Sequence, residues 1–278
     1  MSTALVVGSG LLAIGSGLAG ASSWWWHHQQ RKALYQRLAD KRQRTMIRHQ
    51  NFLLPQPDLE RLSLEFAKQP IITIPACLQP DTLRQLQAEA RQCLAQVERS
   101  YIPLHKQGGA VAYEKLHHYA PACLGLYHSP EFAALLSQLI GLPLAPTADH
   151  DQSSCSLLVY QQQGDHIQWH YDHNFYQGRH FTVLLSLVNE ASQNSDLTQS
   201  CLQYKNQSGE AVSVATPPNR LVVFEGAQVL HRVTPAGANE LRCVLSMTFA
   251  SNSHILFFHE VARRIKDTAF YGMRVLWD

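Results

Sequence analysis

The sequence predicts a mainly β domain with flanking helices, an α+β fold. Three short apolar runs have the length and composition of buried strands: Ser156–Tyr160, Leu221–Phe224 and Cys243–Phe249. Two amphipathic segments with helical periodicity precede them, Asp81–Val97 and Ser129–Ile140. We therefore expect a sheet core in the C-terminal part of the chain, with helices covering one of its faces.

An uncharged apolar segment, residues 4–21, lies near the start of the sequence and is followed by Trp24, Trp25 and Trp26. A membrane-spanning helix needs about 20 mostly apolar residues, and tryptophans gather at membrane interfaces. A basic stretch comes next, made of Arg31, Lys32, Arg37, Lys41, Arg42, Arg44 and Arg48. Because positive residues tend to stay on the cytoplasmic side, we expect residues 1–26 to form a single-pass membrane anchor with the downstream domain in the cytoplasm.

Three other interpretations of this segment differ in how well its residues fit them. A cleaved secretory signal would normally begin with positive charge, and none precedes the apolar run. The glycine spacing mimics a dinucleotide-binding fingerprint, but a basic tract stands where that fold needs an acidic residue. A glycine-rich interfacial or disordered segment stays open as an alternative. We expect residues 27–69 to form a basic juxtamembrane helix and a linker, and residues 70–278 to form the main domain, with its core at about 150–255.

The predicted helix over Ser129–Ile140 has clear start and stop signals. Ser129 can cap its first turn, Pro130 suits the first helical position and Glu131 complements the helix dipole. Gly141 is expected to end the helix. The earlier helix begins at Asp81, another candidate cap. The stretch Lys106–Tyr119 between them is loop-like and aromatic, and could be either a substrate lid or an ordinary surface loop.

The composition is that of a globular protein with little net charge. The chain has 278 residues, of which 45% are hydrophobic and 16% charged, and its net charge is +2. This balance carries no overall signature of nucleic-acid binding. The cysteines are scattered without a Cys-x-x-Cys motif, which predicts buried thiols rather than a disulfide framework: Cys77, Cys93, Cys123, Cys155, Cys201 and Cys243.

Three residues form a candidate metal site. His170 and Asp172 lie two apart, and residues two apart on a strand point to the same face. His231 follows a separate strand and can supply a second imidazole. Two histidines and one carboxylate leave positions open on an octahedral ion, which suits an Fe(II) that must also bind a cosubstrate and O2. Downstream comes Arg242, whose guanidinium fork matches a carboxylate.

Zinc is the main alternative to iron, because it accepts the same three ligands with water in a fourth position. His166, His173 and His180 are further candidate ligands. His166 and His170 have helical spacing, but in a region of strands and turns they would not share a face. We expect the additional histidines to lie around the site or on the surface.

The order of these landmarks resembles that of the Fe(II)/2-oxoglutarate-dependent dioxygenases, and within them the prolyl 4-hydroxylase-like branch. The similarity runs from about Pro70 to the C-terminus and is densest from Ser156 to Ser251. The segment that begins at Pro70 looks like the first strand and first helix of such domains. The other landmarks are Tyr160, Gly164, Arg179, Thr182, Leu184, Asn189, Pro218, Phe224 and Pro235.

This resemblance implies a double-stranded β-helix, a jelly-roll barrel with the site in its mouth. His170, Asp172 and His231 would hold Fe(II), and 2-oxoglutarate would chelate the same ion. Arg242 would bind the distal carboxylate of 2-oxoglutarate, with Tyr160 hydrogen-bonded to the same group. The implied reaction consumes O2, converts 2-oxoglutarate to succinate and CO2, and hydroxylates a substrate; ascorbate could serve as the reductant.

The chain departs from the family pattern at several positions. Arg242 stands where collagen-type prolyl hydroxylases have Lys, so prolyl specificity does not follow. Ser200–Tyr204 replaces the usual Gly-Gly-x-Thr, and Val244 stands where a small hydroxyl residue is common.

Asp172 is a carboxylate rather than Gly or Ala, which leaves no vacant position for a halide and favours hydroxylation over halogenation.

The sequence thus predicts a membrane-anchored dioxygenase that uses Fe(II) and 2-oxoglutarate. A small molecule or a protein side chain could be its substrate, and the absence of a concentrated basic groove in the catalytic region disfavours nucleic acid. A non-catalytic cupin-like module that retains the metal and a zinc hydrolase are the alternatives. At least one of the aromatic residues near the proposed iron is expected to contact substrate, in a region that contains Trp169, Tyr171, Asn174, Phe175 and Tyr176.

Overall fold

The computed structural model describes residues 53–56, 58–147, 151–191 and 197–255, together with residues 33, 37, 40, 262 and 265–267. The chain divides into two compact units, Met1–Gln43 and Arg44–Asp278. The predicted membrane anchor over residues 1–26 lies outside the described residues, so it stays a prediction. Within the described part of the chain, no helix combines the length and the apolar character that a membrane crossing requires.

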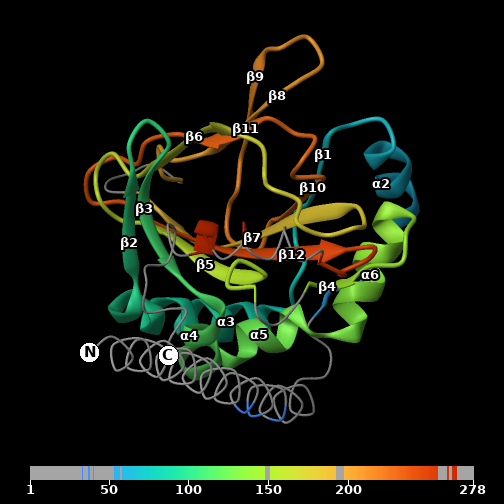
Figure 1. Ribbon diagram of the computed structural model, residues 1–278, viewed down its shortest axis with the longest axis horizontal. Helices are drawn as coiled ribbons and strands as arrows, with labels where there is room; N and C mark the ends of the chain where they lie inside the picture. The colour runs from blue at the N-terminus through green and yellow to red at the C-terminus, as the bar shows by residue number, and fades with distance from the viewer. Residues whose placement is uncertain are drawn as a thin grey trace, which may run out of the picture. The chain divides into compact units, whose positions relative to one another are not determined.

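The second unit is mainly β and curls into a jelly-roll-like sheet (Figure 1). Its strands are β1 Ile71–Ile74, β2 Glu98–Ile102, β3 Lys106–Val111, β4 Ala145–Pro146, β5 Cys155–Tyr160, β6 His166–His170, β7 His180–Glu190, β8 Leu202–Lys205, β9 Ala211–Val214, β10 Leu221–Phe224, β11 His231–Val233 and β12 Leu241–Ala250. The main path of the sheet runs β1-β10-β7-β12-β5-β3-β6-β11-β8-β9, while β2 pairs with β3 and β4 with β12. The three predicted strands are confirmed as β5, β10 and β12.

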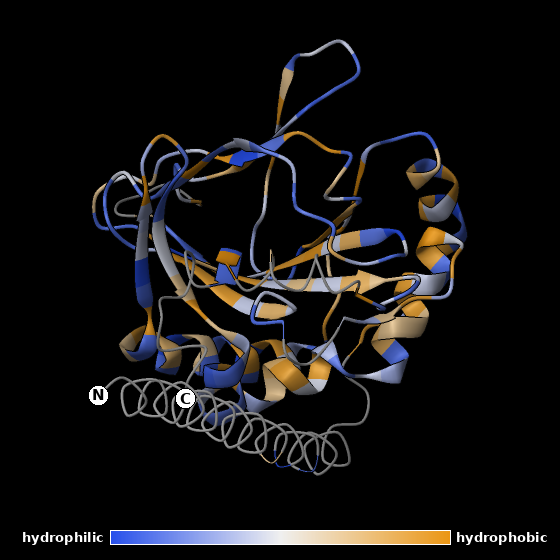
Figure 2. Cartoon of the chain, viewed as in Figure 1, coloured by the Kyte–Doolittle hydropathy of each residue, from blue (hydrophilic) through white to orange (hydrophobic). Residues whose placement is uncertain are grey.

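Helices cover one face of this sheet, as predicted. They are α2 Leu59–Phe66, α3 Pro80–Gln92, α4 Tyr113–Tyr119, α5 Pro121–Tyr127 and α6 Pro130–Ile140, with the 3-10 helix η1 Cys93–Gln96 after α3. Figure 1 shows α3, α4 and α5 below β5 and β12, whereas the β8–β9 hairpin projects from the opposite side. The hydropathy colouring shows apolar residues concentrated between the helices and the sheet (Figure 2).

Alternation along β5 explains how one strand serves both the core and the cavity. Cys155, Leu157 and Val159 belong to the large core that the helices cover. The residues between them face the other side of the strand, where they line a cavity: Ser156, Leu158 and Tyr160. The sheet therefore has a packed face against the helices and an opposite face that can carry chemistry.

The predicted caps of α6 are confirmed. The Ser129 hydroxyl accepts a hydrogen bond from the Phe132 N–H at 3.3 Å, and Gly141 ends the helix in the left-handed region at φ 75°. The earlier helix departs slightly from expectation. Gln79 rather than Asp81 precedes its first residue, and its last turn before Val97 tightens into the 3-10 helix η1.

Two stretches that we expected to be a linker and a loop form regular secondary structure instead. The expected linker contains α2, which packs against α6 and buries Leu62. The stretch Lys106–Tyr119 is strand β3 followed by helix α4, so the expectation of a loop was wrong. Glycines at positions 108 and 109 obscured the strand pattern, although β3 pairs with β2, β5 and β6.

The packing of α2 can be tested with Leu62→Ala against Leu64→Ala. Leu62 is 7% exposed in the core and Leu64 is 63% exposed on the same helix. We expect Leu62→Ala to lower the free energy of unfolding by about 3 kcal/mol, measured by urea denaturation. Leu64→Ala should change it by less than about 0.5 kcal/mol. Equal effects of the two substitutions would show that α2 does not pack on the domain.

Candidate metal centre

His170 and His231 are brought together by strand pairing. His170 ends β6, His231 begins β11, and the two residues are direct partners across the antiparallel pair. The register then shifts, so that Ile167 rather than Gln168 pairs with Val233. This irregularity allows both Ile167 and His170 to face the cavity although they are three residues apart.

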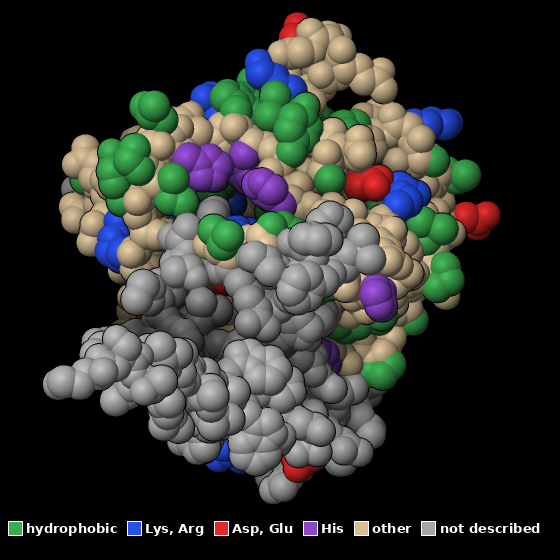
Figure 3. All heavy atoms as spheres, viewed as in Figure 1, with side chains coloured by type: hydrophobic (Ala, Val, Ile, Leu, Met, Phe, Trp, Pro, Cys, Tyr) green, Lys and Arg blue, Asp and Glu red, His purple; other side chains and the backbone are tan. Residues whose placement is uncertain are grey.

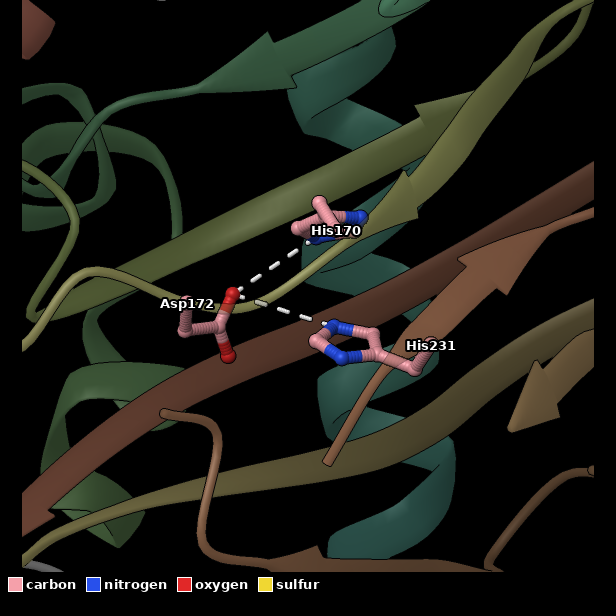
Figure 4. Close-up of side chains that lie close together, drawn as sticks. All are labelled: His170, Asp172 and His231. Carbon is pink, nitrogen blue, oxygen red and sulfur yellow. Dashed lines mark ion pairs between the residues drawn. The ribbon is translucent and has the colours of Figure 1, made fainter. Parts of the chain in front are cut away.

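Asp172 lies two residues beyond the end of β6, rather than on the strand as the spacing suggested. Its backbone N–H donates to the Gly226 carbonyl at 3.0 Å, which fixes the chain where it leaves the sheet. Asp172 Oδ1 lies 3.6 Å from His170 Nε2 and 3.7 Å from His231 Nε2. Figure 4 shows the three side chains converging from their separate segments on one point.

The two imidazoles are oriented by their own backbones. His170 Nδ1 lies 2.7 Å from the Gln168 carbonyl, and His231 Nδ1 lies 2.9 Å from the Val229 carbonyl. A carbonyl only accepts, so each Nδ1 carries the proton and each Nε2 presents its lone pair to the centre. Such backbone contacts commonly orient metal-bound histidines.

The carboxylate of Asp172 is oriented just as firmly. The Thr182 hydroxyl donates to Asp172 Oδ2 at 2.5 Å, which turns Oδ1 toward the two histidines. Gly226 lies against the same carboxylate, because a Cβ at this position would overlap Asp172 Oδ2 and Thr182 Oγ1. A small backbone neighbour and a hydroxyl donor therefore hold this carboxylate in place for a ligand role.

The protonation states also suit metal binding. Burial alone would raise the pKa of Asp172, but the His170 hydrogen bond and the charges of both histidines hold that pKa well below its usual range. Burial lowers the pKa of His231. Burial also acts to lower the pKa of His170, but the hydrogen bond and charge of Asp172 prevail and raise it. A divalent cation would replace the proton that His170 and Asp172 otherwise share.

Among the described residues, His170, Asp172 and His231 make the single group of at least three possible ligands, with ligand atoms within 4.8 Å of one another. Of the other candidate histidines, His173 and His180 line the cavity beside this group without belonging to it. His166 Nδ1 lies 2.7 Å from the Gly164 carbonyl, and His173 stacks on a neighbouring phenylalanine ring. The donor set therefore fits a metal that takes two imidazoles and one carboxylate and keeps open positions.

A cavity of about 200 Å³ opens beside the three residues. Tyr160, Leu158, Leu184, Leu202 and Val233 line its apolar part, and histidine side chains gather on the corresponding face of the molecule (Figure 3). The structure places Tyr171 on the wall of the cavity. In contrast, Trp169 lies under two cations, with Arg232 at 4.5 Å and Lys205 at 5.1 Å from its ring. Substrate contact by this segment stays a prediction.

Arg242 and Tyr160 are cross-strand partners on β12 and β5, and the guanidinium carbon lies 5.2 Å from the tyrosine ring centre. Arg242 is 2% exposed, and burial lowers its pKa. Neither Arg242 Nε nor the Tyr160 hydroxyl has a hydrogen-bond partner with suitable geometry among the described residues. An arginine is strongly unfavourable in such a place unless an anion compensates it. The pair is therefore suited to an anion, and its binding of the distal carboxylate of 2-oxoglutarate, which the resemblance implies, stays a prediction.

Sequence reasoning missed two lysines that line the same cavity, Lys106 on β3 and Lys266 near the C-terminus. Lys106 stands in the stretch that we expected to be a loop, and nothing in the local pattern indicated a buried amine. Asn189, in contrast, was a predicted landmark. Its side chain braces the loop before β8 by bonding to Thr198 N–H and the Thr216 carbonyl.

The family model for Halogenase D matches residues 54–267. The chain belongs to the Halogenase D family. No curated protein matches the chain significantly. The match begins before α2, in agreement with the packing of that helix on the domain.

Solved structures share the fold at low sequence identity. The epimerase SnoN from nogalamycin biosynthesis is 18% identical, with a TM-score of 0.57 over 69% of this chain and 80% of that one. A 2OG-Fe(II) oxygenase family oxidoreductase from Burkholderia pseudomallei is 13% identical, with a TM-score of 0.57 over 74% and 98% of the two chains. A Trichoplax adhaerens prolyl hydroxylase, solved with a peptide fragment, is 17% identical, with a TM-score of 0.56 over 75% and 94%. The predicted resemblance to 2-oxoglutarate-dependent oxygenases is confirmed in the fold.

The role of Thr182 can be tested with Thr182→Val, which keeps the shape of the side chain and removes its donor. We expect the dissociation constant for Fe(II) or Mn(II), measured by anaerobic calorimetry, to rise about tenfold. Thr182→Ser should retain the affinity, because it keeps the hydroxyl. Unchanged metal affinity in a folded Thr182→Val variant would contradict the orienting role.

Proposed function

We propose that this protein is an Fe(II)- and 2-oxoglutarate-dependent dioxygenase that hydroxylates its substrate. One observation supports this proposal more strongly than the others do. An oriented two-histidine, one-carboxylate group lies on the same cavity as Tyr160, whose cross-strand partner Arg242 is a buried cation without an acidic partner among the described residues. A metal and a dicarboxylic cosubstrate would satisfy both features together.

When bound, Fe(II) and 2-oxoglutarate would supply the activation of O2 and release succinate and CO2. The chain's own residues do the positioning. His170, Asp172 and His231 would hold the metal beside the cavity. Arg242 and Tyr160 would bind the far end of the cosubstrate, and the apolar walls around Leu158 would keep water away from its chain.

Asp172 helps to decide whether this chain hydroxylates or halogenates its substrate. Halide transfer needs a free coordination position for the halide, and the Asp172 carboxylate already points at the metal position. The contacts from Thr182 and the tight fit of Gly226 hold it there. These contacts support hydroxylation as the reaction of this chain, despite the name of the family.

A zinc hydrolase needs a general base beside the metal-bound water. Asp172 points at the metal position as a ligand, which leaves His105, His173 and His180 as the candidate bases among the described lining residues. Such an enzyme would give the buried Arg242 no role, so this alternative explains less of the site. A metal-binding module without catalysis would leave the buried Arg242 unexplained, since such a module has no need of a 2-oxoglutarate site.

The proposed reaction predicts succinate formation by the full chain with Fe(II), ascorbate, 2-oxoglutarate and O2. His231→Ala should reduce succinate, quantified by mass spectrometry, to the background level, because one of the metal ligands is lost. His166→Ala is the matched control, since that ring bonds to the Gly164 carbonyl away from the metal and should leave turnover intact. Failure of the chain both to form succinate and to bind 2-oxoglutarate anaerobically would contradict the proposal.

The role of Arg242 predicts a selective effect on the cosubstrate. Arg242→Met should raise the KM for 2-oxoglutarate about 30-fold, as expected from losing a charge-assisted hydrogen bond of about 2 kcal/mol. Fe(II) affinity should stay unchanged, because Arg242 is not a ligand. Arg91→Met, which removes an exposed arginine paired with Glu190, is the control. An unchanged KM in Arg242→Met would place the cosubstrate elsewhere.

A further inference from the structure

The cavity beside the metal site has a polar end on strands β7 and β12. His180 and Thr182 line it from β7, and Thr248 lines it from β12. Thr248 is the direct cross-strand partner of Thr182, and His180 stands two residues before Thr182 on the same face. Thr182 also donates to the metal-site carboxylate of Asp172. The polar end therefore lies beside the metal position, and Thr248 is six positions away from Arg242 along β12.

The hydroxyl groups at this end have their protons engaged within the chain. Thr182 Oγ1 donates to Asp172 Oδ2 at 2.5 Å, and Thr248 Oγ1 donates to the Ser153 carbonyl at 3.4 Å. Ser153, which also lines the cavity, donates through Oγ to Asp267 Oδ1 at 3.3 Å. A hydroxyl has one proton and two lone pairs, so these three groups present acceptor lone pairs to a ligand. This end of the cavity therefore favours a ligand that donates hydrogen bonds.

His180 is a buried imidazole with an unsatisfied nitrogen. It is 6% exposed, and its Nδ1 has no hydrogen-bond partner among the residues that the structure describes. Its ring stacks on the Tyr176 ring, with the two ring centres 6.1 Å apart. Burial lowers the pKa of His180, and a neutral imidazole offers one donor and one acceptor nitrogen. Such an unsatisfied polar atom in a cavity wall costs free energy unless a ligand bonds to it.

The charged groups near this end are paired with one another. The Lys266 amine lies 3.6 Å from Asp267 Oδ1 and 4.0 Å from Asp151 Oδ1. Lys106, the other lysine of the cavity wall, lies toward Tyr160, because β3 pairs with β5 and β6. A ligand ammonium would be repelled by Lys266, and a ligand carboxylate would be repelled by the two aspartates. An uncharged ligand avoids both costs.

We propose that Thr248 and His180 bind an uncharged hydrogen-bond donor of the substrate, a hydroxyl or an amide, and thereby orient the substrate at the metal. This inference rests on the proposed function and adds the chemical class of the substrate to it. Residues that are diagonal to each other across a strand pair lie about 7 Å apart, so one small polar group can contact both. Ser156 and Ser246 pair with each other nearer to Arg242, on the side proposed for the cosubstrate.

The inference can be tested on the Mn(II)-loaded full chain with saturating 2-oxoglutarate. Paramagnetic relaxation of small probes would be measured by NMR. Ethanol and acetamide are the uncharged donors, dimethyl sulfone is uncharged and has no donor, and methylammonium and methanesulfonate carry charge. We expect ethanol or acetamide to be relaxed more strongly than the other three probes. The stronger of these two distinguishes the hydroxyl class from the amide class.

Two variants test whether the probe binds at the polar end. In Thr248→Val and in His180→Phe, relaxation of the preferred probe, measured far below saturation, should fall about fivefold, as for the loss of one hydrogen bond. Thr248→Ser keeps the hydroxyl and should retain the relaxation. Ser213→Ala, which removes an exposed hydroxyl on β9, is the control and should also retain it.

Relaxation of 2-oxoglutarate in every variant confirms an intact, metal-loaded site. If 2-oxoglutarate is relaxed but a charged probe or dimethyl sulfone is relaxed most, the inference is wrong and the proposed function stands. The same conclusion follows if either Thr248→Val or His180→Phe leaves the preferred probe unaffected. If 2-oxoglutarate itself is not relaxed by the bound metal, the proposed function and the inference are both wrong.

Discussion

The pairing of β6 with β11 is the interaction on which the rest of this site depends. It places His170 opposite His231, although the two residues are far apart in sequence. The chain then leaves β6 and is held by the Asp172 N–H bond to the Gly226 carbonyl, which brings the third side chain to the same point. The shift of register in this pair turns the histidine and an apolar residue of β6 toward one cavity. A straight ladder would have sent one of them outward.

Buried charge is the second organising feature. Arg242 and Lys106 are buried and Asp172 is half-buried, and charges in such places are tolerated when opposite charges or bound ions compensate them. Asp172 is compensated by two imidazoles and, in our proposal, by a metal. Arg242 has no acidic partner among the described residues, and in our proposal the distal carboxylate of 2-oxoglutarate compensates it. The distribution of these charges therefore indicates the ligands: a cation at the triad and a carboxylate beside Arg242.

Much of the fold could be predicted from the sequence because its signals are local. The apolar runs of β5, β10 and β12 have strand composition, and Ser129, Pro130 and Gly141 mark the ends of α6 through capping chemistry. The three metal-site residues were also recognisable, because His170 and Asp172 follow one apolar strand, His231 follows a second, and Arg242 opens a third. The order of these landmarks along the chain carried the resemblance to the oxygenases.

The remaining features depend on tertiary contacts that leave little local signal. Lys106 lies in a strand whose neighbouring glycines weaken the β pattern, and its burial follows from the curl of the sheet. Lys266 enters the cavity from the C-terminal segment, which no short motif links to the site. Thr182 and Gly226 acquire their role only because β7 and the turn after β10 both reach Asp172. A residue that acts by touching another functional residue cannot be identified until the fold brings the two together.

The most direct test of the central claim is anaerobic titration of Fe(II) into the full chain with 2-oxoglutarate. Chelation of Fe(II) by a 2-oxo acid gives a visible charge-transfer absorption, which reports the metal and the cosubstrate in one complex. The account predicts that this absorption saturates with a single Fe(II) per chain and is lost in His231→Ala. Tight Fe(II) binding without the absorption, or an undiminished absorption in His231→Ala, would contradict the assignment of the site.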